Sequence, residues 1–176
     1  MPNFRHRLTT TRQRIYDRSD AVSSVPLRAS PRLRAAVAAL AAGLEAGAPE
    51  RVERIAQAIV DEIGSALRVP PVRVVVSGSR PANARGELHG LYIPAGHPSA
   101  RGGPAVIKVW MITAKRGQVV AFKTFLRTLL HEVCHHLDYA LLRLPESFHS
   151  SGFYKRESSL FYQIGGGGAG LKTDGC

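Results

Sequence analysis

The stretch QVVAFKTFLRTLLHEVCHHLDYALL, residues 118–142, decides the fold of this chain. Its apolar residues recur close to every 3.6 positions, and neither glycine nor proline interrupts residues 118–144. This spacing predicts one long amphipathic helix whose apolar side packs into the core of the protein. We expect the other elements of the chain to pack around this helix.

A polar stripe on this helix contains His131, His135 and Asp138, and Glu132 lies beside it. Two histidines four residues apart project from the same face of a helix, and Glu132 lies about 100° around the axis from His131. That arrangement suits a zinc ion bound by both imidazoles, with the carboxylate beside it as a base that activates water. The alternative is a solvated helix face on which these side chains share no ligand.

A catalytic zinc ion takes three protein ligands, so the sequence must supply one more. The candidates near the helix are Asp138, Glu146, His149 and Glu157. We expect His149 to be the third ligand, because the thirteen residues after His135 allow the chain to end the helix and return. Glu157 is the alternative ligand. If His149 binds, Glu157 and Asp138 would instead hydrogen-bond close to the ligands.

The motif HExxH at residues 131–135, followed by HxxxF at 149–153, resembles the zincin metallopeptidases, and its second half is similar to SprT-like (Spartan) proteases. The resemblance implies a minimal zincin domain with one zinc ion held by the three histidines. It implies that Glu132 is the general base of peptide hydrolysis, and that an edge strand above the metal pairs with an extended substrate. Residues Ala105–Ile112 are our candidate for that strand. Ser150 departs from the pattern, because a glycine usually follows the third histidine.

Length and composition indicate one domain with less ordered ends. With 176 residues and 44% hydrophobic content, the chain is long enough for one core and short for two. We expect residues 1–29 to be a flexible or partly ordered basic segment, 30–164 the zincin-like domain, and 165–176 a flexible glycine-rich tail. No run of eighteen apolar residues occurs, so no membrane span is expected. Two cysteines and no signal pattern favour a cytoplasmic location.

The net charge of +11 suggests a polyanionic partner in addition to a peptide or protein substrate. Residues 1–34 contain eight arginines, and residues 101–127 contain six basic residues and no acid. Such zones favour contact with nucleic acid through the release of counterions, although an arginine-rich segment can also serve solubility alone. The alternative function is therefore a nucleic-acid-associated binding protein whose zinc site is structural and not catalytic.

The remaining segments indicate an α+β domain with a small sheet. Amphipathic helices are predicted after Ser30-Pro31, with the serine as N-cap, and from Pro49 to Leu67. Strands are predicted at residues 72–76, 88–93 and 105–112, and a short helix at 158–164. This order predicts a three-stranded, mostly antiparallel sheet packed on helices that include the HExxH helix. His136, about 100° around the helix from His135, is expected to face solvent.

Overall fold

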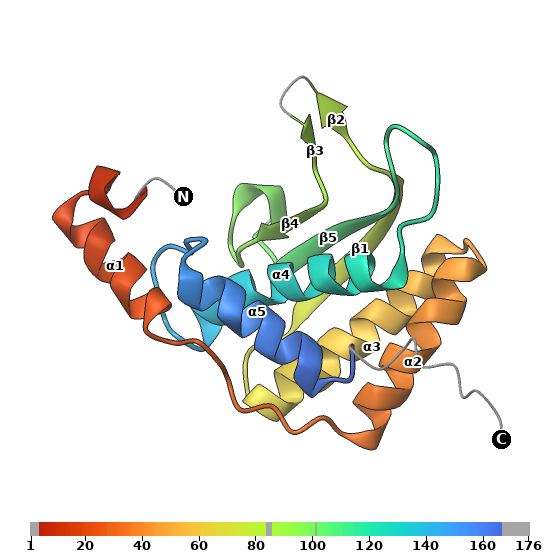
Figure 1. Ribbon diagram of the computed structural model, residues 1–176, viewed down its shortest axis with the longest axis horizontal. Helices are drawn as coiled ribbons and strands as arrows, with labels where there is room; N and C mark the ends of the chain where they lie inside the picture. The colour runs from red at the N-terminus through yellow and green to blue at the C-terminus, as the bar shows by residue number, and fades with distance from the viewer. Residues whose placement is uncertain (1–3, 84–85, 101, 167–176) are drawn as a thin grey trace, which may run out of the picture.

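The computed structural model describes residues 4–83, 86–100 and 102–166 of the chain (Figure 1). Its elements are η1 (Phe4–Arg7), α1 (Thr10–Asp20), α2 (Pro31–Glu45), α3 (Pro49–Leu67), β1 (Val72–Ser79), β2 (Ala82–Asn83), β3 (Gly86–Glu87), β4 (Gly90–Ile93), η2 (Pro98–Ala100), β5 (Ala105–Ile112), α4 (Phe122–Ala140) and α5 (Ser151–Gln163). Residues 167–176, most of the expected tail, lie outside the described residues. Within the described part, no helix is both long and apolar enough to cross a bilayer.

The main sheet has three strands in the order β1, β5, β4. β1 pairs with β5 in parallel, from Val72 opposite Ala105 to Ser79 opposite Ile112, and β4 pairs with β5 antiparallel. The α+β class is confirmed, but the sheet is mixed, and its longer pairing is parallel. The prediction that residues 105–112 form an edge strand is wrong, because β1 and β4 flank that strand on both sides.

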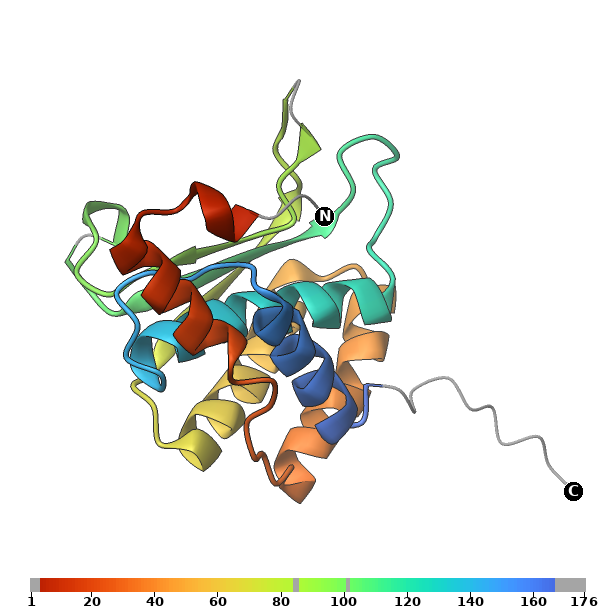
Figure 2. The ribbon, with the colours of Figure 1, turned by 60° about the vertical axis from the view of Figure 1, so that its left-hand side comes forward.

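One core lies between this sheet and the helices that cover it (Figure 2). Alternate residues of the strands point into it, and the buried ones are Val72, Val74 and Val76 of β1 and Ala105, Ile107, Val109 and Met111 of β5. The apolar stripes of α2, α3 and α4 pack against these side chains. All three helices occur where the periodicity of the sequence predicted them.

The two edges of the main sheet differ in what covers them. Side chains of α3 hydrogen-bond the outer edge of β1: Val74 N–H donates to Gln57 Oε1 at 2.7 Å, and Val76 N–H donates to Glu53 Oε2 at 2.8 Å. Gln57 Nε2 also donates to the carbonyl of Val72 at 3.0 Å. Among the described residues, the outer edge of β4 has no neighbouring strand. Apart from the Tyr92 N–H, which the Glu132 carboxylate accepts, β4 is therefore the edge to which a strand can be added.

The N-terminal segment is more ordered than its sequence indicated. Helix α1 packs its buried Ile15 against Leu144 and Phe148, which belong to the loop between α4 and α5. After α1 the chain runs along the main core, in which Val25 and Leu27 are buried. Few apolar residues mark this segment in the sequence, so its order depends on contacts with distant parts of the chain.

Gly152 of α5 makes a close contact with this segment. Its N–H donates to Asp20 Oδ1 at 2.7 Å, and a Cβ at this position would lie 2.2 Å from the Asp20 carbonyl oxygen. We expect Gly152→Ala to lower the free energy of unfolding by about 1–3 kcal/mol, measured by urea denaturation. Gly64→Ala is the matched control, because a helical Cβ there would have its nearest neighbour at 3.8 Å. Equal effects of both substitutions would contradict the tight contact.

Candidate metal centre

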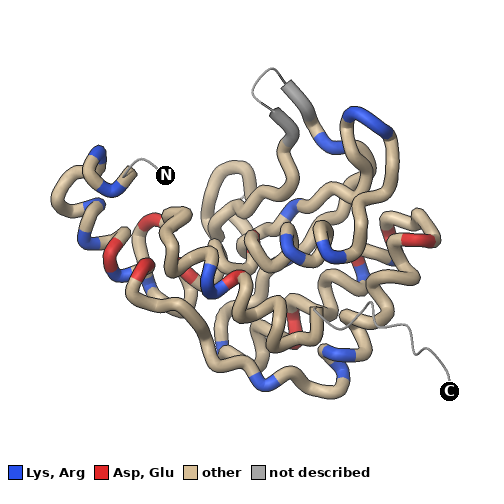
Figure 3. Tube along the Cα trace, in the orientation of Figure 1, with Lys and Arg blue, Asp and Glu red and all other residues tan. Residues whose placement is uncertain are grey.

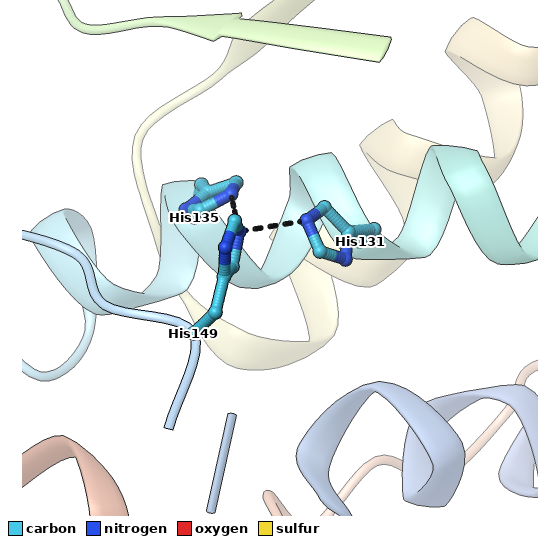
Figure 4. Close-up of side chains that lie close together, drawn as sticks. All are labelled: His131, His135 and His149. Atoms are coloured by element: carbon cyan, nitrogen blue, oxygen red, sulfur yellow. Dashed lines mark hydrogen bonds between the residues drawn. The ribbon is translucent and has the colours of Figure 1, made fainter. Parts of the chain in front are cut away.

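Three histidines converge where α4 faces the loop that precedes α5 (Figure 4). His131 and His135 are one turn apart on α4, and His149 comes from the loop, directly before Ser150. Nε2 of His149 lies 3.0 Å from Nε2 of His131 and 3.1 Å from Nε2 of His135. Each side chain offers one ligand atom, and these atoms lie within 4.8 Å of one another. The structure thus brings together the three residues that the sequence predicted as ligands.

The spacing of these nitrogens suits a single metal ion. Two nitrogens bound at about 2.0–2.1 Å to a tetrahedral zinc ion lie about 3.3 Å apart, close to the 3.0 and 3.1 Å between the ring nitrogens here. Each neutral imidazole carries only one N–H, so three ring nitrogens directed at one point are best satisfied by a shared cation. The donor set fits zinc and leaves one tetrahedral position for a further ligand.

Hydrogen bonds on the opposite ring nitrogens orient two of the histidines. Nδ1 of His131 lies 3.1 Å from Glu157 Oε2, and Nδ1 of His135 lies 2.7 Å from Ser147 Oγ. The Ser147 hydroxyl donates in turn to Asp138 Oδ2 at 2.6 Å. Because these partners accept, both Nδ1 atoms carry the proton and the Nε2 lone pairs are left for a metal ion. The structure thus places Glu157 and Asp138 outside the histidine cluster, as partners of the hydrogen bonds around it.

The surroundings of the cluster lower the pKa values of His135 and His149. Burial, together with the nearby His131 and His149, lowers the pKa of His135 to about 3. The pKa of His149 is also lowered, first by burial and then by His131. A metal ion competes with protons for the same ring nitrogen, so lowered pKa values favour metal binding at neutral pH.

Phe153 forms the apolar base of the cluster. The residue is fully buried, and its ring centroid lies 4.9, 4.8 and 5.2 Å from those of His131, His135 and His149. Ser150 caps α5, because its hydroxyl accepts the Phe153 N–H at 3.1 Å. The serine that stands in place of the expected glycine therefore fixes the start of α5, and with it the positions of Phe153 and His149.

Glu132 lies beside the cluster without joining it. The residue is 5% exposed, and β4 covers it: the backbone N–H of Tyr92 hydrogen-bonds its carboxylate. A Cβ on Gly90 would lie 2.5 Å from Glu132 Oε1. The carboxylate therefore occupies the space that the side chain of any residue other than glycine would fill at position 90. Burial raises the pKa of Glu132 to about 7, although His131 and the Tyr92 N–H lower it. A carboxyl group with this pKa can take up and release a proton near neutral pH.

The loop that carries His149 is held from two sides. On one side, Asp138 of α4 accepts the hydroxyl of Ser147 in the loop at 2.6 Å, and it is itself paired with the fully buried Arg156 of α5. On the other side, Arg12 of α1 donates to both carboxylate oxygens of Glu146, and Phe148 packs in the apolar cluster beneath α1. Both members of the Arg12 pair are exposed, so it adds at most about 1 kcal/mol. The buried contacts are therefore the main anchors of the loop.

The structure corrects one prediction near the motif and adds residues that the sequence pattern did not indicate. His136 does not face solvent: it is buried, its Nε2 donates to the Pro70 carbonyl at 2.9 Å, and its Nδ1 accepts from the Tyr92 hydroxyl at 3.1 Å. Gly90 and Ser147 also belong to the site. Ser147 lies two positions before a predicted ligand, which is a weak signal, and nothing in the sequence connects Gly90 or Tyr92 to the motif helix.

Comparison with protein-family models, with curated proteins and with solved structures gives no match. The geometry by itself supports a group of three histidines that could hold one metal ion. A catalytic role has to be argued from the residues that surround this group.

We expect the protein to bind one zinc ion per chain, measured by elemental analysis after dialysis and by competition with a chromogenic chelator. His149→Ala removes a ligand. Loss of only the hydrogen-bond partner of a ligand weakens metal binding roughly 10- to 100-fold, so we expect a larger loss of zinc affinity here. His97→Ala is the control, because His97 is exposed and lies outside the cluster. If both variants bind zinc as the unchanged protein does, His149 is not a ligand.

Proposed function

We propose that this protein is a zinc-dependent peptidase of the zincin type, similar in its motif to SprT-like proteases. His131, His135 and His149 would hold the ion, and Glu132 would be the general base. The observation that carries the proposal is the position of Glu132, which is buried under β4 beside the three histidines and is not one of the converging donors. Hydrolysis by an activated water requires such a carboxylate, whereas a structural zinc site does not.

Each residue around the cluster has a function in this mechanism. A zinc ion supplies a Lewis acid that polarises the peptide carbonyl and lowers the pKa of a water ligand toward neutrality. Glu132 takes the proton from the attacking water and passes it to the leaving amine. Gly90 and the Tyr92 N–H hold this carboxylate in position, while Glu157 and Ser147 orient the imidazoles.

The open edge of β4 supports an extended peptide as the substrate. A hollow of about 330 Å³ lies between Gly90, Leu91 and Tyr92 of β4 and the cluster of His131, Glu132, His135 and His149. A peptide paired with β4 would run through this hollow, with its backbone close to Glu132. Since α3 covers the outer edge of β1, we infer that β4, and not residues 105–112, is the strand that pairs with substrate.

Charge alone supports the alternative of a nucleic-acid-associated binding protein with a structural zinc ion. The basic residues of α1 lie at the opposite end of the molecule from those of the loop after β5 (Figure 3). Because these basic zones lie apart, the metal centre carries the stronger inference. A cytoplasmic peptidase acting on nucleic-acid-associated proteins would account for both the metal centre and the basic charge. Salt-dependent retention on DNA without any peptidase activity would favour the alternative instead.

Glu132→Gln tests the general base, because the amide keeps the shape of the side chain and cannot take up the proton. We expect zinc to remain bound at one ion per chain, while kcat for a fluorescently labelled, denatured casein falls by about 10²- to 10⁴-fold. Glu45→Gln on the exposed surface of α2 is the control and should leave kcat unchanged. Undiminished hydrolysis by the zinc-loaded Glu132→Gln protein would exclude this mechanism.

Gly90→Ala tests how Glu132 is held. The new methyl group would displace the Glu132 carboxylate, so we expect kcat to fall at least about tenfold while zinc affinity stays within a few-fold of the unchanged protein. In the Glu132→Gln background the same substitution should have no further effect on kcat, since it acts through Glu132. Gly78→Ala in β1 is the matched control, because a Cβ there would have its nearest neighbour at 3.8 Å. Additive losses would show that Gly90 acts in some other way.

A further inference from the structure

A second hollow, of about 400 Å³, lies directly beside the metal centre. It shares Tyr92, Pro94 and Tyr139 with the hollow above the histidines, so the two hollows are adjacent. The rings of Tyr92 and Tyr139 are stacked, with centroids 5.7 Å apart and planes 18° apart, and Tyr92 also stacks on His135 at 6.4 Å. These two tyrosines therefore form a wall that begins at a predicted ligand and leads into the second hollow.

The polar groups of this hollow are already hydrogen-bonded. Both ring nitrogens of His136 are used, by the Pro70 carbonyl and by the hydroxyl of Tyr92. The backbone of Ser147 hydrogen-bonds the Tyr139 hydroxyl. No Asp, Glu, Lys or Arg lines the hollow in the described part of the chain. Most of the surface left to contact a ligand is therefore apolar, and it comes from two rings and several small or cyclic side chains.

The walls are also rigid. Prolines 70, 71, 94 and 104 line the hollow, and Ala95, Ala105 and Ala140 complete it. Proline has a fixed φ and its ring has little freedom, so these walls lose little conformational entropy when a ligand binds. The hydrogen bond between the Tyr92 hydroxyl and His136 Nδ1 fixes the position of the Tyr92 ring in the wall that the two hollows share. The hollow is therefore formed before any ligand arrives.

We infer that this hollow is a specificity pocket that binds a large apolar or aromatic side chain of the peptide substrate, at a fixed position close to the bond that is cleaved. The inference rests on the proposed peptidase function, which places the peptide backbone along β4. Tyr92 belongs to β4 and borders both hollows, so the second hollow lies next to the path of a peptide paired with β4. A charged side chain would lose its hydration there and find no partner, so it is disfavoured.

Binding to the zinc-loaded Glu132→Gln protein tests the pocket separately from catalysis. Two pools of fluorescent decapeptides are compared by anisotropy, one rich in Phe, Tyr, Leu and Met, and one in which Ser and Gly replace these residues. Burial of one such side chain is worth about 1.5–3 kcal/mol, so we expect Kd to be roughly 10- to 150-fold lower for the apolar pool. Equal affinity for both pools would overturn the inference.

Filling the pocket provides the second arm of the test. Ala140→Phe adds a ring at the end of α4 without altering a histidine, and we expect it to abolish the preference for the apolar pool while zinc affinity is unchanged. Ala58→Phe on the exposed surface of α3 is the matched control and should retain the preference. A preference that persists in Ala140→Phe would place the apolar contact elsewhere and overturn the assignment.

A cleavage experiment then tests the pocket and the proposed peptidase function independently of each other. With the unchanged zinc-loaded protein and a peptide library, mass spectrometry should find Phe, Tyr, Leu or Met enriched at one position relative to the cleaved bond. Cleavage without any such enrichment would contradict the pocket and leave the peptidase function standing. Selective binding of the apolar pool without cleavage by any zinc-loaded form would contradict the peptidase function and leave the binding pocket standing.

Discussion

The guanidinium group of Arg156 has no access to solvent, and three parts of the chain meet on it. It forms an ion pair with Asp138 of α4 at 2.6 Å and donates to two backbone carbonyls of the N-terminal segment. A buried charge is strongly destabilising unless it is paired, so α4, α5 and this segment are restricted to arrangements that satisfy Arg156. The same carboxylate accepts the Ser147 hydroxyl, which accepts from His135. The orientation of a candidate ligand therefore depends on an ion pair that never touches the metal centre.

The hydrophobic core, and not the metal ion, holds the residues of the metal centre in place. Ten residues of α4 are buried, so packing holds the helix that carries His131 and His135. Small zinc domains that unfold without their metal lack such a core. Here burial already lowers the pKa of His135, and the Nδ1 hydrogen bonds of His131 and His135 already set the direction of the lone pairs. Zinc would stabilise the folded state by binding to it, without being needed to form it.

The sequence predicted the features that depend on local periodicity and failed where distant segments decide the structure. The motif helix, the strand at 105–112 and the proximity of His149 followed from spacing alone. The parallel pairing of β1 with β5 could not be predicted, because alternation of side chains is the same for either strand direction. His136 was misassigned because the face it occupies is covered by the turn at Pro70, from a distant part of the chain. Helix α1 has too few apolar residues to be recognised without the loop on which Ile15 packs.

The position of the open sheet edge links this fold to the proposed chemistry. If both edges were free, an extended peptide could pair with either, and most of its encounters would be far from Glu132. Glu53 and Gln57 of α3 use their side chains to satisfy the outer edge of β1, whereas on β4 the Glu132 carboxylate accepts the Tyr92 N–H and no described strand lies alongside. β4 also covers Glu132, and the absence of a side chain at Gly90 lets strand and carboxylate come this close. In the proposed peptidase, the hydrogen bonds that close one edge therefore direct the substrate to the other, where the general base lies.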